Sequence, residues 1–143
     1  MMQPLVANVE QETVLQKREK IYFSEGLLAF ENIREFELVA NPDEAPFLWL
    51  QDVNNSKLAF ITIDPFLVFP RYRPDIPAED LEALKIRSPG DVFITCIVNI
   101  KHAKTQGVTA NLVSPVVINW KEGIGKQIIL ANYQHYLVKF KIS

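Results

Sequence analysis

Two β-rich runs near the end of the chain constrain its fold most. Asn111–Asn119 is rich in valine and isoleucine, and Gln127–Leu130 follows it after a short connection. That connection, Lys121–Lys126, contains Gly123 and Gly125, which can adopt the positive φ that a tight reversal needs. The amides that end the first run and open the second either satisfy backbone groups or contact a partner. Because neither run contains an acid, a base or a metal ligand, this hairpin indicates binding rather than chemistry.

The rest of the sequence pattern predicts mostly short strands. Each candidate is rich in β-branched or aromatic residues and is bounded by Gly, Pro, Asn or Asp. Phe47–Leu50 and Phe93–Val98 lack clean alternation, so we expect both to be covered on two faces. Pro115 has no amide donor and is predicted at a strand edge or bulge. The predicted strands are Thr13–Gln16, Lys20–Phe23, Phe36–Val39, Phe47–Asp52, Ala59–Ile63, Phe93–Ile100, Thr109–Leu112, Val116–Trp120, Gln127–Leu130 and Val138–Lys141.

Few segments depart from this strand pattern. Ala78–Ile86 follows Pro77 and has helix formers with acids in its first turn, which predicts a short amphipathic helix. A second helical turn is predicted near Leu28–Ile33. Asp64–Pro70 is an apolar stretch fenced by prolines, which either anchors a loop in the core or presents a docking patch. These patterns predict a mainly β fold: a small antiparallel β-barrel, or barrel-like sandwich, with one or two short helices.

Length and charge narrow the class of protein. The chain has 143 residues, of which 48% are apolar, so we expect one domain over 1–143 with the first ~20 residues loosely held. A net charge of −2 and a pI of about 5.7 disfavour a phosphate-binding surface. The N-terminal pattern is not that of a signal peptide, and no apolar run reaches the ~20 residues that span a bilayer. We therefore expect a cytoplasmic protein that contacts neither nucleic acid nor membrane.

The residue types that usually carry catalysis are sparse. Cys96 lies in an apolar run, which predicts an inert, buried thiol. His102 and His135 belong to no zinc-ligand spacing, and no nucleophile elbow is present. We predict no catalytic residue, no metal site and no cofactor, and hence no enzyme. The acid pairs Asp43–Glu44 and Glu79–Asp80 are predicted to be solvated or capping, or to form an acidic patch for a basic partner.

Several short segments have a characteristic order and spacing between about Ile21 and Tyr133. They are Phe23–Phe30, Leu50–Asp52, Ala59–Phe66, Tyr72 with Pro77, Thr109–Leu112, Pro115 with Asn119, and Gly125–Leu130. In this order and spacing the chain resembles the FliW family of flagellar assembly factors. The family often has glycine where Ala29 stands and serine where Asp52 stands, so Ala29 is strained if its turn requires a positive φ.

The resemblance implies a cytoplasmic, non-enzymatic protein with a small antiparallel β-barrel fold. Members of the family bind flagellin before its export and alternatively bind the translational regulator CsrA. Secretion of flagellin frees FliW, which then captures CsrA and relieves repression of flagellin mRNA. CsrA presents a basic RNA-binding surface, which suits an acidic partner. We expect a monomer that acts as a partner switch between flagellin export and flagellin synthesis.

The partner-binding residues are predicted from the residue types of the hairpin, of the apolar Asp64–Pro70 stretch and of the Ala78–Ile86 helix. The hairpin supplies Asn111, Asn119, Ile124 and Gln127 as the first candidates. An apolar patch suits an amphipathic helix of flagellin, and the acids suit a basic partner. The further candidates are Phe66 and Phe69 for apolar contact, and Glu79, Asp80 and Glu82 for charge.

Two other classes of function stay open at this point. A barrel could bind nucleic acid directly in the manner of an OB-fold, although its aromatics lie in apolar strands and are not interleaved with Lys and Arg. A small ligand-binding or enzymatic barrel would need a deep pocket that places His102 or His135 beside a carboxylate. A steep salt dependence of RNA affinity would support the first, and such a pocket would support the second.

Overall fold

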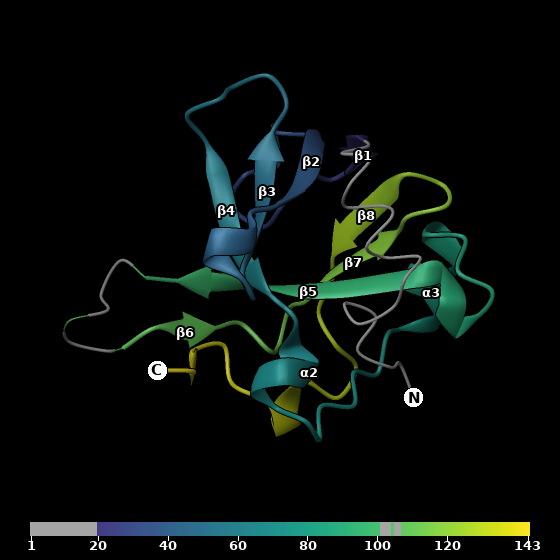
Figure 1. Cartoon of the computed structure of the whole chain (residues 1–143). Coiled ribbons are helices and arrows are strands. Elements are labelled where there is room, and N and C mark those ends of the chain that lie inside the picture. Colours follow the sequence, from purple (N-terminus) through teal and green to yellow (C-terminus); the bar gives the residue numbers. More distant parts are fainter. Residues whose placement is uncertain (1–19, 101–103, 105–106) are drawn as a thin grey trace.

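The computed structural model of the chain describes residues 20–100, 104 and 107–143 (Figure 1). The predicted strand Thr13–Gln16 and His102 lie outside the described residues, as does the expectation about the first ~20 residues. The strands are β1 (Lys20–Tyr22), β2 (Glu35–Ala40), β3 (Leu48–Asp52), β4 (Ala59–Ile63), β5 (Val92–Asn99), β6 (Thr109–Ala110), β7 (Val116–Asn119), β8 (Ile124–Gln127) and β9 (Phe140–Lys141). The α-helices are α2 (Pro65–Val68) and α3 (Ala78–Ala83), and the 3-10 helices are η2 (Pro42–Glu44), η3 (Pro89–Asp91) and η4 (Tyr133–His135).

The predicted β-barrel is confirmed. Strands run in the order β4-β3-β2-β1-β8-β7-β5, and pairing of β4 with β5 closes the ring, while β6 and β9 extend the sheet beyond β5. Every neighbouring pair is antiparallel except β1 and β8, which meet in parallel through Tyr22 and Ile124. One seam of the barrel therefore depends on a short parallel contact.

Strand β5 joins the two halves of the molecule. It runs across the middle of the molecule in Figure 1, with β2, β3 and β4 on one side of it and α2 on the other. Its first half pairs with β7, residues Cys96 and Ile97 pair with β4, and Val98 and Asn99 pair with β6. This position explains the apolar run, because β5 is buried on both faces, as the missing alternation predicted. The same prediction for β3 is wrong, since its residues alternate between buried and half-buried.

The core consists of two clusters separated by β5 and β7. Phe93 and Ile118 face the barrel interior with residues of β1 to β3, including Phe36. Ile94 and Val117 face the other side, where Tyr72 and residues near α2 and α3 cover them. Because successive strand residues point to opposite faces, a strand between two cores is apolar over most of its length, and Thr95 is the buried polar exception in β5.

The predicted helix over Ala78–Ile86 is confirmed but ends at Ala83. Lys85 has φ 57°, its amide donates to Glu82, and the Ile86 amide donates to Leu81. These two bonds form a Schellman motif, which stops the helix. The helical turn predicted over Leu28–Ile33 is wrong, because that segment forms reversals with an isolated bridge between Leu27 and Phe30.

Sequence reasoning missed the helix α2. Asp64 caps it, because its Oδ1 accepts a hydrogen bond from the Phe66 amide at 2.8 Å. Pro65 occupies the first helical position, where its missing amide costs nothing. A cap followed by proline is a helix-start signal, but four residues give no periodicity by which to recognise the helix.

The second strand of the hairpin is Ile124–Gln127, so the predicted Gln127–Leu130 strand is wrong. Of the two hairpin glycines, Gly123 has the positive φ of a reversal, at 68°, and Gly125 does not. Gly125 lies within β8, where a Cβ atom would approach the Phe23 ring to 2.7 Å. Gly125 therefore allows close packing against a ring and is not part of the turn. The strand begins three residues earlier in the sequence than predicted.

Two further expectations concern Pro115 and membrane-spanning segments. Pro115 comes directly before β7, outside the ladder, as predicted, and its carbonyl accepts from the Ile128 amide at 3.0 Å. Within the described ranges, no helix is both long and apolar enough to cross a membrane.

Candidate functional site

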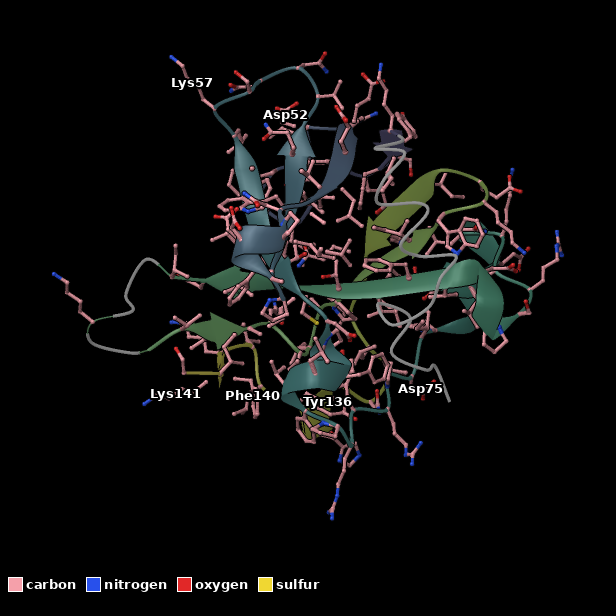
Figure 2. The ribbon with its side chains drawn as sticks, viewed as in Figure 1. Asp52, Lys57, Asp75, Tyr136, Phe140 and Lys141 are labelled. Atoms are coloured by element: carbon pink, nitrogen blue, oxygen red, sulfur yellow. The ribbon has the colours of Figure 1, made fainter. Side chains whose placement is uncertain are left out.

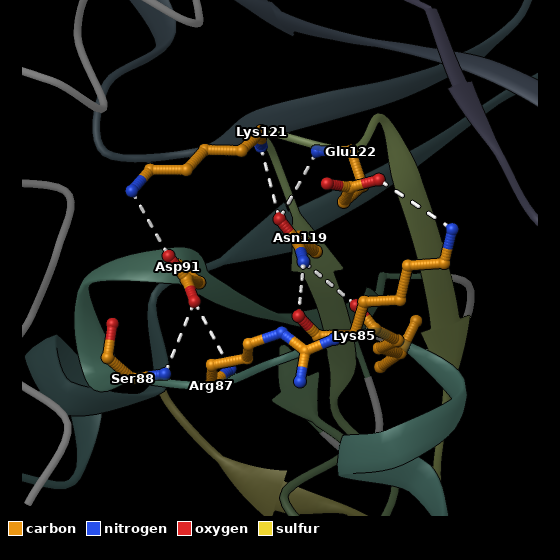
Figure 3. Close-up of polar contacts among 8 residues, drawn as sticks. Lys85, Arg87, Ser88, Asp91, Asn119, Lys121 and Glu122 are labelled. Atoms are coloured by element: carbon orange, nitrogen blue, oxygen red, sulfur yellow. Dashed lines mark hydrogen bonds and ion pairs between the residues drawn. The ribbon is translucent and has the colours of Figure 1, made fainter.

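The hairpin between β7 and β8 is fixed to the end of α3 by one side chain (Figure 3). The Asn119 amide nitrogen donates to the Leu84 carbonyl at 2.8 Å and to the Lys85 carbonyl at 3.2 Å. Its oxygen accepts from the amides of Lys121 and Glu122, at 3.2 and 3.3 Å. Asn119 is buried, and both ends of its amide are used internally. Of the two roles considered for this asparagine, the structure places it in the backbone-satisfying one.

Two ion pairs lie next to this contact, Lys121 with Asp91 and Lys85 with Glu122 (Figure 3). Asp91 lies 3.1 Å from the Lys121 ammonium, and its other oxygen accepts from the amides of Arg87 and Ser88 (Figure 3). The backbone bond from Arg87, followed by Lys121, lowers the pKa of Asp91 below its ordinary value. Both amides and the lysine favour the charged carboxylate, so the segment before β5 is tied to the hairpin.

The other two amides of the predicted site are also engaged with backbone. Gln127 accepts from the Leu28 amide at 3.0 Å and donates to the Ser114 carbonyl at 3.1 Å. The Asn111 oxygen accepts from the amides of Val113 and Ser114, at 3.1 and 3.0 Å. The polar residues of the hairpin region therefore connect loops to strands. Their role as partner contacts stays a prediction.

The predicted apolar site residues lie mostly inside the molecule. Ile124 is half-buried and packs against the cluster that includes Val117. Phe66 is buried with its ring 5.6 Å from that of Tyr72. Phe69 is half-buried between Tyr136 and Phe140, which lie together beside α2 in Figure 2. The Asp64–Pro70 stretch thus anchors in the core at both phenylalanines, while Leu67 is exposed.

The three acids of α3 have different surroundings. Asp80 is buried and its Oδ1 accepts from the Lys126 ammonium at 2.7 Å, while Glu25 lies 3.3 Å from the same ammonium. The Asp80 hydrogen bond raises the pKa of Lys126 above its ordinary value, which keeps the lysine charged. Glu79 and Glu82 are exposed. Neither has an ion pair or a side-chain hydrogen bond to another residue within the part of the chain that the structure describes.

Glu79 and Asp80 border a recess between β8 and α3, which we call the β8–α3 groove. It has a volume of about 440 Å³ and contains two of the predicted acids together with Gln127. Leu28 and Ile129 on its wall are 49% and 56% exposed, although both are large and apolar. Figure 1 shows β8 and α3 at the same end of the molecule. Its lining residues are Glu25, Leu28, Pro77, Glu79, Asp80, Lys126, Gln127, Ile128 and Ile129.

Sequence reasoning did not place six members of this groove in the binding site: Glu25, Leu28, Pro77, Lys126, Ile128 and Ile129. Glu25 and Leu28 lie about 100 residues before β8 in the sequence. The hydrogen bond from the Leu28 amide to the Gln127 side chain, 99 residues apart, holds this segment against β8. No local pattern encodes such a contact. Ile129 could have been recognised as a groove residue only with the correct strand bounds. The predicted Gln127–Leu130 strand placed Ile129 inside a strand, whereas β8 ends at Gln127.

A second recess is apolar and lies where β3 and β4 diverge from β5 and β6. It has a volume of about 230 Å³ and is lined by Glu44, Phe47, Trp49, Ile61, Ile100 and Val108. Trp49 and Ile61 are cross-strand partners, and the Trp49 indole donates to Glu44 at 3.0 Å. We call it the Trp49 cleft. Its wall explains why β3 alternates only weakly in hydrophobicity, since the outward face of the strand is itself apolar.

The polar side chains of Cys96 and Tyr72, next to α2, are buried in the core. Cys96 is fully buried, and burial raises the pKa of its thiol well above the ordinary value. Tyr72 donates to the Leu112 carbonyl at 2.7 Å, and burial also raises its pKa. A thiol that stays protonated is a poor nucleophile, so Cys96 behaves as the predicted inert core residue. Among the described residues, no group of His, Cys, Asp and Glu could hold a metal ion.

Comparison with known proteins assigns the family. A family model described as FliW protein matches residues 4–142 of the chain.

The chain belongs to the FliW family.

Its FliW relatives include the flagellar assembly factor FliW of Leptospira biflexa, which is 40% identical over 125 residues, covering 87% of this chain and 82% of the relative. The flagellar assembly factor FliW of Thermosipho africanus is 34% identical over 132 residues, covering 92% and 90%. A crystal structure of the flagellar assembly factor FliW matches with a TM-score of 0.78 and 35% identity, covering 89% of this chain and 87% of that chain. The predicted resemblance is thus confirmed.

Two residues differ from the FliW pattern described above. Ala29 has a φ of 70°, so the position where the family often has glycine does require the left-handed region. Asp52, which is labelled in Figure 2, is buried, and its Oδ1 accepts from the Asn54 amide at 2.8 Å at the start of the β3–β4 loop. A serine hydroxyl could accept the same bond, so Asp52 departs from the family pattern without changing the turn.

Proposed function

We propose that this flagellar assembly factor is a non-enzymatic partner switch. In this proposal it binds flagellin in the cytoplasm and, when free, binds and antagonises the translational regulator CsrA, which relieves repression of flagellin mRNA. Membership of the FliW family over residues 4–142 carries the proposal. The names of its relatives support the flagellar role.

The described surface supports a binding role over a catalytic one. The β8–α3 groove and the Trp49 cleft share no lining residue. The first is lined by several acids, and the second is mostly apolar. Cys96 is buried with a raised pKa, and His135 is exposed and contributes to neither recess. Grooves lined by exposed apolar residues with charged rims are typical of protein interfaces.

Calorimetric titration with the flagellin and the CsrA of the same organism tests the proposal. Each partner is titrated alone and then into protein that has been saturated with the other. Tight binding of both partners with mutual exclusion is the expected result. Binding of flagellin without CsrA would make the protein an export-side chaperone only, and binding of neither would overturn the proposal.

A further inference from the structure

The β8–α3 groove combines apolar walls with an excess of negative charge. Three carboxylates line it, those of Glu25, Glu79 and Asp80, against the single ammonium of Lys126. Leu28 and Ile129 supply exposed apolar surface between these charges. Exposed large apolar side chains gathered at a recess indicate a binding site, and the charges determine which partner chemistry fits it.

Lys126 leaves one carboxylate of the groove available. Its ammonium bridges Asp80 at 2.7 Å and Glu25 at 3.3 Å, and Asp80 is the more buried of the two acids. Glu79 is exposed on the same wall and has no ion pair within the described parts of the chain. Among the described residues, Glu79 is therefore the carboxylate of the groove that is free to pair with a cation from a partner.

The groove is also firmly built, so a partner would not have to order it. The Gln127 side chain ties Leu28 to the Ser114 backbone, and Asn119 fixes the hairpin to the end of α3. Ile128 is buried beneath the groove, while the adjacent Ile129 points outward. Pre-organised surfaces lose little entropy on binding.

We propose that the β8–α3 groove is the docking site for a protein segment that carries an apolar side chain beside a lysine or arginine. The apolar side chain packs on Leu28 and Ile129, and the cation pairs with Glu79. This inference deepens the proposed function and rests on it. The Trp49 cleft offers no comparable set of carboxylates, so it is not the site for a cationic segment.

The test compares two charge reversals on the same helix. Glu79→Lys places a cation in the groove, whereas Glu82→Lys makes the same change on α3 outside the groove lining. Glu82 is therefore excluded from the proposed docking site, although the sequence pattern predicted it as a partner contact. Binding of flagellin and of CsrA to the full chain is measured by calorimetry at low and at moderate salt. We expect Glu79→Lys to weaken at least one of the two partners by about tenfold or more and to reduce the salt dependence of that affinity. Glu82→Lys should stay within about twofold of the wild type.

Two further variants address the apolar contact and the risk of misfolding. Ile129→Asp should weaken the same partner by about tenfold or more, because Ile129 is exposed and its loss removes contact area without opening the core. Glu79→Gln removes the charge without placing a lysine in the first turn of the helix. Circular dichroism and the melting temperature of each variant show whether it is folded.

The outcomes separate this proposal from the proposed function. If the wild type binds flagellin or CsrA while Glu79→Lys, Glu79→Gln and Ile129→Asp bind equally well, the docking site is overturned and the partner switch stands. Equal loss in Glu82→Lys and Glu79→Lys would also overturn it, since a general charge effect would then explain the loss. A wild type that binds neither protein would overturn both proposals.

Discussion

At the scale of single residues, the turn after β1 shows how one side chain conflicts with its backbone. Ala29 has φ 70°, and Gly26, which closes the preceding turn, has φ 63°. A Cβ atom costs about 1 kcal/mol in the left-handed region. Gly26 has no room for a Cβ atom, because a Cβ at this position would lie 2.6 Å from the Phe30 carbonyl oxygen.

Ala29→Gly should therefore stabilise the protein. We expect the free energy of unfolding to rise by about 0.5 kcal/mol, since relief of strain exceeds the entropy that glycine adds to the unfolded chain. Urea unfolding followed by circular dichroism measures the change. Gly26→Ala is the matched control and should lower stability by about 2 kcal/mol or more. A loss of stability in Ala29→Gly would show that the turn tolerates alanine without strain.

The buried carboxyl of Asp64 makes stability depend on pH. Only one of its oxygens has a hydrogen-bond partner, and Oδ2 has none among the described residues. Burial, opposed by the Phe66 amide, raises the pKa of Asp64 from 3.8 to about 6. A raised pKa means that the folded state binds the proton more tightly than the unfolded state. Asp64 therefore costs nothing below about pH 4, and its destabilising effect grows through pH 4 to 6 and is complete above that range.

Asp64→Asn removes this titration and keeps the acceptor for Phe66. The variant should gain about 1 kcal/mol relative to the wild type when the pH rises from 5 to 8. Comparing urea unfolding of both proteins at the two pH values isolates Asp64, because all other titrating groups are shared. A stability difference that does not change with pH would contradict the raised pKa.

At the scale of elements, the amide of Asn119 holds three segments together. It joins β7, the turn after it and the end of α3 through four hydrogen bonds. Truncation leaves two carbonyls and two amides without their partner, and those that are buried lose the most.

Asn119→Ala should lower the free energy of unfolding by about 2 to 4 kcal/mol. Asn119→Asp is an informative control, because its carboxylate still accepts from Lys121 and Glu122 but cannot donate to Leu84 and Lys85. Thermal and urea unfolding measure both variants without any partner present. If Asn119→Ala is as stable as the wild type, the connection is not structural and Asn119 becomes a stronger candidate for partner contact.

At the scale of the whole molecule, the two seams of the barrel differ in strength. The β4–β5 seam pairs Thr62 with Ile97 and Ile63 with Cys96 in the buried centre. The β1–β8 seam has the single parallel pair of Tyr22 and Ile124, and the Tyr22 side chain is exposed. A short, exposed seam opens at lower free energy than a buried one.

Hydrogen exchange should reveal this difference. The Tyr22 amide, which donates to the Gly123 carbonyl, should exchange at least about tenfold faster than the amides of Ile63 and Cys96, which pair across the β4–β5 seam. Amide exchange followed by NMR at neutral pH resolves these residues. Equal protection at both seams would mean that the barrel opens only by global unfolding.

The sequence by itself was sufficient for the class of fold and for most of the strands. Ala59–Ile63 has its predicted bounds, and the apolar pattern of β5 correctly predicted burial on two faces. These features follow from local composition and from the alternation of side chains along a strand. The family resemblance was also readable, because it depends on the order of residues along the chain.

Only the tertiary structure decided the roles of Gly125, Asn119 and Glu79. Gly125 faces the Phe23 ring, Asn119 bonds to a helix about 35 residues earlier, and Glu79 lies on the same groove as Ile129. Each role depends on a contact between segments far apart in sequence. Local patterns do not encode such contacts, because they arise only when the barrel closes and brings β1, β8 and α3 together.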